Sequence, residues 1–480
     1  MMPNFKKTGP FSFVADRDGD MKVPAEVIAS DILMRSLRES KNEGSLQQLL
    51  NVAMMPGIIW KALAMPDVHQ GYGFPIGGVA AFDAEEGLVS PGGVGYDINC
   101  GIMLLKTDLA YNEVKPKTPE IVDRLFSSIP TGNNKSGMQL NSSSLIEKIA
   151  REGCMWAEEM GYCTSEDRAR MEDGGSLPVN SSSPLSASAK SRGMNQLLSI
   201  GGGNHFIEVQ RVDHISDTQK AKILGIEEGQ VMVMVHTGSR GLGHQVATDF
   251  MQLLSSKAEG SVIHPKDPQL NSAHIKSRLA ERYLDAMNSA ANFAHVNRAL
   301  IMWKIRKIFS DIFGMDEYRV SLLYSLSHNM VKIENHNVDG SNIDLVVHRK
   351  GATRAFGPSR FSVKSPFSLT GQPVIVPGDM GTASYLLSGI DSNDSISLES
   401  ACHGAGRIMS RHTALSSFKY SDIITDLKKS DIVAKAATRN GLIEESPGNY
   451  KNIDEVVRVA SESGISCIVC RMKPMGVIKG

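Results

Sequence analysis

Cysteine is scarce in this 480-residue sequence, and the positive and negative charges of the chain nearly cancel. The six cysteines are too few and too scattered for a disulfide framework: Cys100, Cys154, Cys163, Cys402, Cys467 and Cys470. The formal net charge of -1 gives no sign of a nucleic-acid partner at the level of the whole chain. Any RNA-binding surface must therefore be a local basic patch.

Two kinds of apolar segment are also missing from the sequence. It shows no secretory leader and no apolar run of membrane length. We therefore expect a cytoplasmic protein that makes no membrane contact. In that reducing compartment, Cys100 stays available as a thiolate ligand.

Several common catalytic motifs are absent. The sequence has no G-x-x-x-x-G-K-[ST] phosphate loop and no G-x-G-x-x-G fingerprint after a strand. It has neither a G-x-S-x-G elbow nor the Lys-x-Asp-Gly box of ligases that adenylate a lysine. If a nucleotide is activated covalently in this protein, the nucleophile is not that lysine.

The chemically informative motifs run from Asp67 to Lys479, so they must converge in space. With 41% hydrophobic residues, the chain can bury a large core. We therefore expect one α+β catalytic domain over residues 1–480, with mixed helices and strands and with neither a P-loop nor a Rossmann unit. Low hydrophobicity and abundant serine predict a mobile loop at 173–192.

Hydrophobic periodicity places helices and strands along the chain. Helical spacing predicts helices at 23–40, 119–128, 145–162 and 272–313. Apolar runs predict a strand–loop–strand unit at 57–82, a strand–turn–strand unit at 197–212, and strands at 102–109, 231–238, 319–326, 343–348 and 373–376. The last segment, 464–480, is expected to be a strand followed by an extended tail.

The pair Asp97-x-x-Cys100, in the glycine-rich stretch SPGGVGYDINCG, is the most informative feature of the chain. A tight turn with this spacing aims a carboxylate and a thiolate at one ion, and both groups can bridge two metals about 3.5–4 Å apart. His205, His236 and His328 lie near glycine, asparagine or serine and are the imidazole candidates. This mixed set suits Mn, Zn, Co or Fe better than Mg or Ca. The alternatives are a buried free cysteine and satisfied structural histidines.

His403 lies in the motif CHGAGR. Gly404 and Gly406 would let the backbone approach a phosphate closely, and Arg407 could neutralise its charge. A histidine in this setting could be a nucleophile that takes a nucleotidyl group as a phosphoramidate. The alternative, one more metal ligand, stays open at the level of the sequence.

Two further pairs of side chains belong to the candidate site. Asn204 and Asn329 adjoin two of the candidate histidines, and their amides are natural donors to phosphate oxygens. Asp67 and His69, in MPDVHQGYG, lie on one face of an extended segment. This second pair is either a structural hydrogen bond or part of the site, and the sequence favours neither.

Eight ordered motifs together resemble the RtcB family of GTP-dependent RNA ligases, in its longer archaeal-type form: SPGGVGYDINCG, GGGNHFIEVQ, VHTGSRGLGHQV, SLSHNM, VHRKGATRAF, PGDMGTASY, HGAGR and PMGVIKG. The resemblance covers about residues 66–480. It implies an α+β fold without a P-loop, built around a site for two metal ions, typically Mn²⁺.

The resemblance also implies an activity. Members of the family join an RNA 3′-phosphate or 2′,3′-cyclic phosphate end to a 5′-hydroxyl end. They guanylylate a histidine with GTP, pass GMP to the 3′-phosphate, and let the 5′-hydroxyl attack. Spliced tRNA halves are the usual RNA partner, and the small protein archease is the usual activator. For this chain we expect a monomer.

Carried over motif by motif, the resemblance assigns a role to each site residue. The residues that match metal ligands are Asp97, Cys100, His205, His236 and His328, and His403 matches the guanylylated histidine. The residues assigned to GTP are Asn204, Glu208, Asn329, Asp379, Ser384, Gly404, Ala405, Gly406, Arg407, Tyr450 and Lys479, with Tyr450 stacking and Lys479 close to guanine. The residues expected to face RNA are Arg192, Arg240 and Arg411.

One position departs from the family pattern. Asp379 stands where the family usually carries serine or threonine, and a carboxylate beside a triphosphate would repel it unless a cation lies between them. Two other functions remain open: a dinuclear metal-dependent phosphodiesterase, and a non-catalytic RNA-binding relative. His403 and Lys479 favour the ligase over the first, because a hydrolase needs neither a nucleophile nor a base-specific pocket. The intact ligand set argues against the second.

Overall fold

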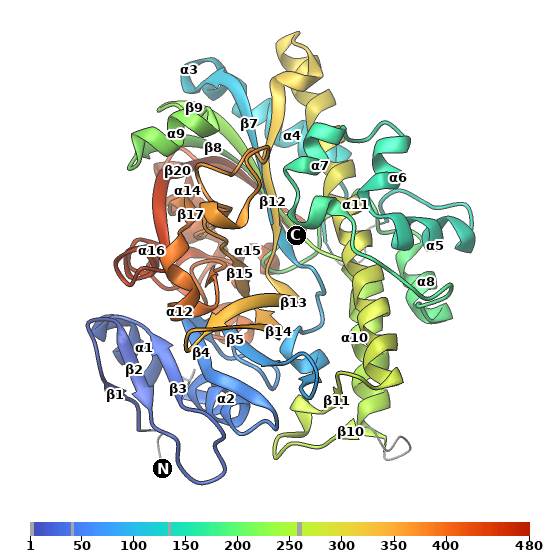
Figure 1. The fold of residues 1–480 in the computed structure, drawn as a ribbon. Coiled ribbons are helices and arrows are strands. Elements are labelled where there is room, and N and C mark those ends of the chain that lie inside the picture. The colour runs from blue at the N-terminus through green and yellow to red at the C-terminus, as the bar shows by residue number, and fades with distance from the viewer. Residues whose placement is uncertain (1–3, 40–42, 133–135, 257–261) are drawn as a thin grey trace.

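The computed structural model describes residues 4–39, 43–132, 136–256 and 262–480, and its described part has mixed helices and sheets (Figure 1). The α+β fold class is thereby confirmed. One sheet has seven strands, in the order β1 (Lys6–Lys7), β2 (Ser12–Ala15), β3 (Ala25–Ile28), β4 (Ile58–His69), β5 (Ile76–Asp83), β14 (Ser341–Lys350) and β13 (Asn329–Val338).

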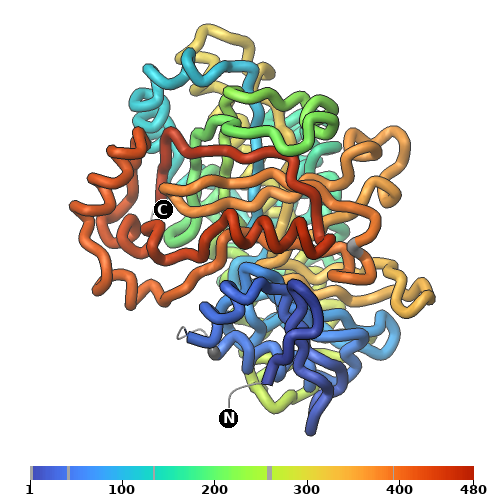
Figure 2. The backbone as a smooth tube through the Cα atoms, turned by 90° about the vertical axis from the view of Figure 1, so that its left-hand side faces the viewer, coloured from blue at the N-terminus to red at the C-terminus, as the bar shows by residue number. Residues whose placement is uncertain are grey.

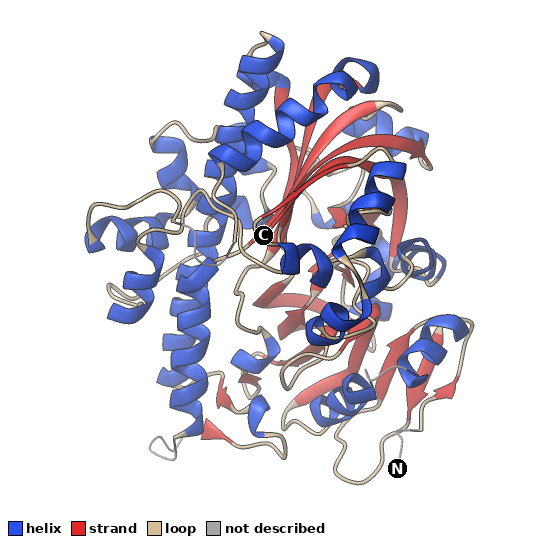
Figure 3. Cartoon of the chain, turned by 180° about the vertical axis from the view of Figure 1, so that it is seen from behind, coloured by secondary structure: helices blue, strands red, loops and turns tan. Residues whose placement is uncertain are grey.

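A second large sheet carries most of the candidate site. Its order is β12 (Val320–Ser327), β7 (Gly101–Ala110), β9 (Gln230–Thr237), β8 (Phe206–Ile215), β20 (Ser466–Lys479), β17 (Ser384–Gly389) and β16 (Pro373–Val376), with β19 (Val433–Ala436) paired to β20. Two smaller sheets pair β10 (Val262–Ile263) with β11 (Ser272–His274) and β6 (Leu88–Val89), and β15 (Ala352–Arg354) with β18 (Ser400–Cys402). In Figure 3 the large sheet is a curved layer flanked by helices.

Strand β9 shows why this sheet is buried on both faces. Its side chains alternate with the period of two that a pleated strand imposes. Val231, Val233 and Val235 belong to the largest hydrophobic cluster, whereas Met232 and Met234 belong to a second one. Both faces therefore lie against apolar layers, and the strand reads as a continuous apolar run.

The longest helix, α11 (Arg278–Phe313), packs against this architecture along its length. It contacts α4 (Thr118–Ser128), α5 (Ser143–Glu152), α6 (Cys154–Glu159) and α10 (Arg240–Ser255), and Figure 1 shows α10 and α11 in the same long column. Helix α8 (Ala187–Gly193) packs on α5 and α10. Helix α16 (Ile453–Glu462) packs on β4 and β20 and so connects the two large sheets.

Most predicted strands and the helix at 119–128 are confirmed by β4, β5, β7, β9, β12, β14, β16 and α4. The helix predicted at 23–40 is wrong in its first half, where β3 pairs in parallel with β4 before α1 (Asp31–Glu39) begins; position 40 lies outside the described residues. Pairing along the sheet overrides the local helical spacing there. The helix predicted at 145–162 breaks at Gly153, whose φ is +57°.

Four further boundaries differ from the expectations. The helix at 272–313 begins only at Arg278, after the short strand β11. In the unit at 197–212 only the second strand, β8, forms. The serine-rich segment 173–192 contains part of α8, which Ser186 caps by accepting from the Ala189 amide. The expected C-terminal tail is a continuation of β20, which pairs with β19 and β8 up to Lys479 (Figure 2, red).

Within the described part of the chain, no helix combines the length and the apolar character that a bilayer crossing requires.

Candidate metal centre and nucleotide pocket

The candidate metal ligands lie near one end of four neighbouring strands, β12, β7, β9 and β8. Asp97 and Cys100 form the turn that enters β7, and His205 immediately precedes β8. His236 is the penultimate residue of β9, and His328 joins β12 to β13. The register aligns these positions, because Phe206 and Ile102 both pair with His236, and Gly101 pairs with Ser327. Strand pairing therefore gathers ligands that are far apart in the sequence.

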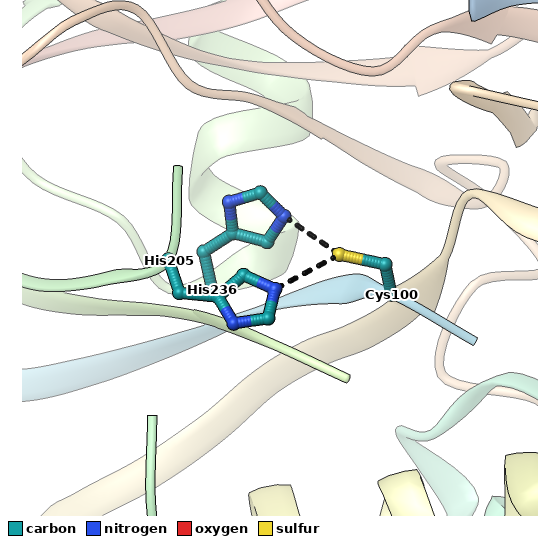
Figure 4. Close-up of side chains that lie close together, drawn as sticks. All are labelled: Cys100, His205 and His236. Carbon is teal, nitrogen blue, oxygen red and sulfur yellow. Dashed lines mark hydrogen bonds between the residues drawn. The ribbon is translucent and has the colours of Figure 1, made fainter. Parts of the chain in front are cut away.

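The side chains of all five candidates meet at short distances. The Sγ atom of Cys100 lies 3.3 Å from His205 Nε2 and 3.2 Å from His236 Nε2, and Figure 4 shows both rings directed at the sulfur. His236 Nε2 is 3.3 Å from His328 Nε2. His205 Nε2 lies 2.9 Å from Asp97 Oδ2. One carboxylate, one thiol and three imidazoles therefore converge on a common volume.

The chemistry of this cluster fits a metal ion. Asp97 Oδ1 is buried and has no hydrogen-bond partner, which is a free lone pair in the middle of the site. The Nδ1–H of His236 donates to the Asn204 carbonyl at 3.0 Å, which leaves the Nε2 lone pair facing Cys100. Burial holds the pKa of His236 and of His328 well below the usual range, so both rings are neutral donors. Burial and Asp97 raise the pKa of the Cys100 thiol, and a bound cation would favour its release as thiolate.

His403 lies beside this cluster and is held by Asp67. The fully buried carboxylate of Asp67 accepts hydrogen bonds through Oδ2 from His403 Nδ1 at 2.6 Å, from the His403 amide at 3.0 Å and from the Gly404 amide at 3.3 Å. With Nδ1 donating, the lone pair of His403 is on Nε2. The His403 ring centroid is 4.9 Å from that of His328. The Nε2 atom of His403 therefore belongs to the same pocket as the candidate metal ligands.

The contact with His403 answers the question about Asp67 and His69. His69 Nδ1 contacts the backbone carbonyl of Asp67 at 3.0 Å, while the carboxylate faces His403. Burial alone would raise the pKa of Asp67, but His403 outweighs it and lowers the value. Gly406 has a φ of +74°, and a Cβ there would lie 2.1 Å from the Asp67 carbonyl oxygen. Only glycine lets the HGAGR loop approach the strand this closely.

A pocket of about 1030 Å³ opens over the metal cluster and His403. It is at the upper end of the range of about 300–1,000 Å³ that ligand pockets usually span. Eight of the residues assigned to GTP line it: Asn204, Asn329, Gly404, Ala405, Gly406, Arg407, Tyr450 and Lys479. The two asparagines also support the candidate metal ligands, because Asn329 Nδ2 donates to the Asp97 carbonyl at 3.0 Å and the Asn204 carbonyl accepts from His236.

The other three residues assigned to GTP lie outside that lining. Glu208 and Ser384 are buried and linked by Gln210, whose Nε2 lies 2.7 Å from the carboxylate and 3.0 Å from the hydroxyl. Burial raises the pKa of Glu208 to about 7. Asp379 is also buried, and its oxygens accept from the Gly381 amide and from Thr382 Oγ1, both at 2.8 Å. Asp379 therefore caps its own turn.

Glu445, a buried carboxylate that the sequence analysis missed, collects the polar side chains of the pocket. It lies 3.1 Å from Arg407 NH1, 3.6 Å from Arg411 Nε and 3.7 Å from Lys479 Nζ. It also accepts a hydrogen bond from the Tyr450 hydroxyl. Glu445 thereby fixes the positions of the aromatic and cationic groups around the pocket. Nothing in the local sequence LIEESPGNY distinguishes it from its neighbour Glu444.

Arg298, a fully buried residue of α11, supports the segments that carry the candidate metal ligands. Its guanidinium donates to the Asn99 carbonyl at 2.9 Å, to Asn99 Oδ1 at 2.8 Å and to the Thr237 carbonyl at 3.1 Å. Asn99 has a φ of +51° and lies in the turn between Asp97 and Cys100, and Thr237 follows His236. The arginine therefore ties two ligand-bearing segments together. In the sequence it resembles any exposed basic residue of a long helix.

The three arginines expected to face RNA have different surroundings. Arg192 is exposed at the end of α8, where it donates to Gln245 Oε1 at 3.1 Å. Arg240 is buried at the start of α10 and donates to Ser199 Oγ at 3.3 Å and to the Gly132 carbonyl at 3.2 Å. Arg411 lines the pocket, with half of its side chain exposed.

The fold and the site together define an α+β protein with a candidate metal centre beside a carboxylate-held histidine. The chain belongs to the RtcB family, because the sequence model described as "tRNA-splicing ligase RtcB" matches residues 48–480. A relative of that name from Thermococcus kodakarensis is 44% identical over 465 residues, which are 96% of each chain. A relative of the same name from Pyrobaculum aerophilum is 43% identical over 463 residues, which are 96% of this chain and 95% of the relative. Another from Nanoarchaeum equitans is 44% identical over 478 residues, which are 99% of each chain. The resemblance stated from the motifs is thus confirmed.

Proposed function

We propose that this chain is an RNA ligase that uses GTP and two Mn²⁺ ions to join RNA 3′-phosphate or 2′,3′-cyclic phosphate ends to 5′-hydroxyl ends. The archaeal relatives are named tRNA-splicing ligases, so tRNA halves are the proposed substrate. We further propose that it acts as a cytoplasmic monomer, with archease as an activator.

The contact between Asp67 and His403 carries this proposal. A buried carboxylate that accepts from Nδ1 fixes the tautomer, turns the ring and stabilises the positive charge that grows when Nε2 forms a bond. A histidine that only ligated a metal would serve equally well with a carbonyl at Nδ1, which is the partner that the candidate ligand His236 has. The arrangement favours His403 as the nucleophile.

The proposed reaction has three group transfers. His403 Nε2 attacks the α-phosphorus of GTP, so that a P–N bond forms and the P–O bond to pyrophosphate breaks. An oxygen of the RNA 3′-phosphate then attacks the same phosphorus, which breaks the P–N bond and returns the imidazole. The 5′-hydroxyl finally loses its proton and attacks the activated 3′-phosphorus, and GMP leaves. A 2′,3′-cyclic phosphate is first hydrolysed to the 3′-phosphate.

The chain's own residues would position these partners. Gly404, Ala405 and Gly406 present backbone to the phosphates, and Arg407 neutralises charge. Ions held by the five candidate ligands would supply Lewis-acid stabilisation of phosphate oxygens. For the base, we propose that Tyr450 stacks on guanine and that Lys479 lies at its edge.

We assign RNA binding to three arginines, of which Arg411 lines the pocket. We propose that Arg192 and Arg411, which have exposed side chains, contact RNA phosphates directly. Arg240 is buried 4 residues after His236, so its guanidinium would act at the phosphates closest to the metals.

The test is a ligation assay with one RNA that ends in a 3′-phosphate and a labelled second RNA that begins with a 5′-hydroxyl. With GTP and Mn²⁺, the proposal predicts a joined product that disappears without GTP and in His403→Ala. Joining that proceeds without GTP would contradict it. Cleavage or dephosphorylation of the RNA without joining would instead indicate the metal-dependent phosphodiesterase.

A further inference from the structure

Three aromatic side chains from separate segments form a continuous ladder at the edge of the pocket. Tyr72 lies in the loop between β4 and β5, Tyr96 immediately precedes the candidate ligand Asp97, and His244 is on α10. The ring centroids of Tyr72 and Tyr96 are 5.5 Å apart with an interplanar angle of 61°. Those of Tyr96 and His244 are 4.8 Å apart and stacked at 24°.

The first two rings of this ladder line the same pocket as Cys100 and His403. Neither belongs to the group of side chains that Glu445 holds around the proposed guanine position. The pocket therefore has a second aromatic wall, distinct from Tyr450, next to the metal ligands.

The two outer residues of the ladder, Tyr72 and His244, are exposed and Tyr96 is half-buried, although the backbone that carries the two tyrosines is firmly held. The Tyr72 side chain is among the exposed large hydrophobic groups, with 37% of its surface accessible. The buried Nζ of Lys350 donates to the Tyr72 carbonyl at 2.6 Å and to the Gly92 carbonyl at 3.0 Å, which ties together the loops that carry Tyr72 and Tyr96. A fixed ring that keeps part of its surface accessible beside a polar site is suited to stacking against a ligand.

A cationic side chain lies at the outer end of the ladder. Arg192 NH1 is 3.4 Å from His244 Nδ1 and 3.1 Å from Gln245 Oε1, and the side chain is exposed. Aromatic rings next to a guanidinium are a combination with which proteins bind single-stranded nucleic acid. The rings stack on bases of any sequence, and the arginine neutralises a phosphate.

We propose that Tyr72, Tyr96 and His244 form a stacking track for the terminal bases of a single-stranded RNA end, which leads that end from Arg192 to the metal centre. The proposal rests on the ligase function above, which requires RNA ends in this pocket. It adds a subsite for unpaired bases, and stacking of this kind would accept ends of any sequence.

The test uses short oligoribonucleotides that carry the fluorescent base 2-aminopurine at the terminal nucleotide. One series ends in a 3′-phosphate and the other begins with a 5′-hydroxyl, so the two arms identify which RNA end occupies the track. Stacking on an aromatic ring quenches this fluorophore. Binding to the wild-type protein should therefore quench the label in at least one series.

Removing a ring should weaken binding by about 5- to 150-fold, the equivalent of about 1–3 kcal/mol per stacked base. Tyr72→Ala, Tyr72→Leu and Tyr96→Leu should show this loss together with reduced quenching, whereas Tyr72→Phe keeps the ring and should bind like the wild type. Leucine preserves apolar bulk, which separates lost stacking from lost packing. Tyr318→Ala is the matched control, because Tyr318 is a tyrosine with 65% exposure that lies outside this pocket.

The outcomes separate the two proposals. If the wild-type protein ligates and binds the oligonucleotides but the leucine variants bind and quench equally well, the stacking track is wrong and the ligase function stands. If the wild-type protein neither binds nor joins RNA ends, both proposals fail.

Discussion

Replacing Asp67 with asparagine should slow the transfer of GMP to His403 without removing the histidine. In the structure Asp67 is fully buried and accepts three hydrogen bonds, the shortest at 2.6 Å from His403 Nδ1. An asparagine can turn its NH₂ group toward His403 Nδ1, so that Nδ1 accepts the hydrogen bond. The ring proton then lies on Nε2, which is the nitrogen that must attack. The substitution therefore removes a charge and also favours the wrong tautomer.

The expected size of this effect follows from the lost charge and from the changed tautomer. A hydrogen bond to a charged group contributes about 1.5–3 kcal/mol, which alone corresponds to about 10- to 150-fold in rate. Where a carboxylate-to-amide change also inverts a catalytic tautomer, losses of about 10⁴-fold occur. We therefore expect Asp67→Asn to guanylylate His403 about 10²- to 10⁴-fold more slowly than the wild type.

The assay is a single-turnover measurement of label transfer from α-labelled GTP to the protein, with thermal unfolding and Mn²⁺ affinity measured on the same samples. Asp67→Glu is the companion variant, because it keeps the charge but shifts its position. A rate for Asp67→Asn within about threefold of the wild type would refute the reasoning. So would a loss of rate that only accompanies loss of folded protein or of Mn²⁺.

Four other predictions concern the metal, the support helix, the C-terminus and pH. Cys100→Ala should abolish guanylylation, and Mn²⁺ or Co²⁺ should outperform Mg²⁺; full activity with Mg²⁺ alone would contradict the mixed ligand set. Arg298→Met should weaken Co²⁺ binding more than Arg298→Lys does, as measured by the thiolate–cobalt absorption band. Equal spectra in both variants and the wild type would show that the Arg298 contacts are dispensable for the site. Deleting the last two residues should lower both the melting temperature and GTP use, because Lys479 is a buried, paired residue of β20; an unchanged melting temperature would contradict this. Burial raises the folded-state pKa of Glu208 to about 7, so the free energy of unfolding of the nucleotide-free protein should fall by up to about 3 kcal/mol between pH 4.5 and 7, relative to Glu208→Gln. Denaturant titrations that give identical pH profiles for the two proteins would refute this cost of burial.

The prediction about the C-terminus reverses an expectation drawn from the sequence. An extended tail after a strand would contribute little to the core, and its removal would affect only guanine binding. In the structure residues 476–479 pair with β19 on one side and β8 on the other. Glycine and proline in PMGVIKG argue locally against a strand that the sheet register nevertheless imposes. We therefore expect stability and nucleotide binding to be coupled at this end of the chain.

Local motifs revealed the candidate metal site well, because each candidate ligand lies within two residues of a glycine, asparagine or serine that marks a turn at a strand end. Asp97, Cys100, His205, His236 and His328 were all named from such settings, and the structure brings the five together. What the sequence could not supply is the strand order β12-β7-β9-β8, which depends on pairing between distant segments.

Contacts between residues far apart in the sequence could not be predicted for the same reason. Asp67 and His403 are separated by 336 positions, so no spacing rule joins them. Glu445 and Arg298 are buried charged residues in segments that read as ordinary exposed surface. Asp379 was singled out by its position in a motif, and the structure adds what the motif could not show, that its oxygens accept hydrogen bonds within its own turn.

The most direct test of the account is to find where GMP becomes attached to the protein. After incubation with GTP and Mn²⁺, peptide mass spectrometry should locate a GMP adduct on His403, and the bond should be labile in acid and stable in alkali, as expected of a P–N linkage. His403→Ala should carry no label. An adduct on a lysine, an acid-stable bond, or undiminished labelling of His403→Ala would contradict the account.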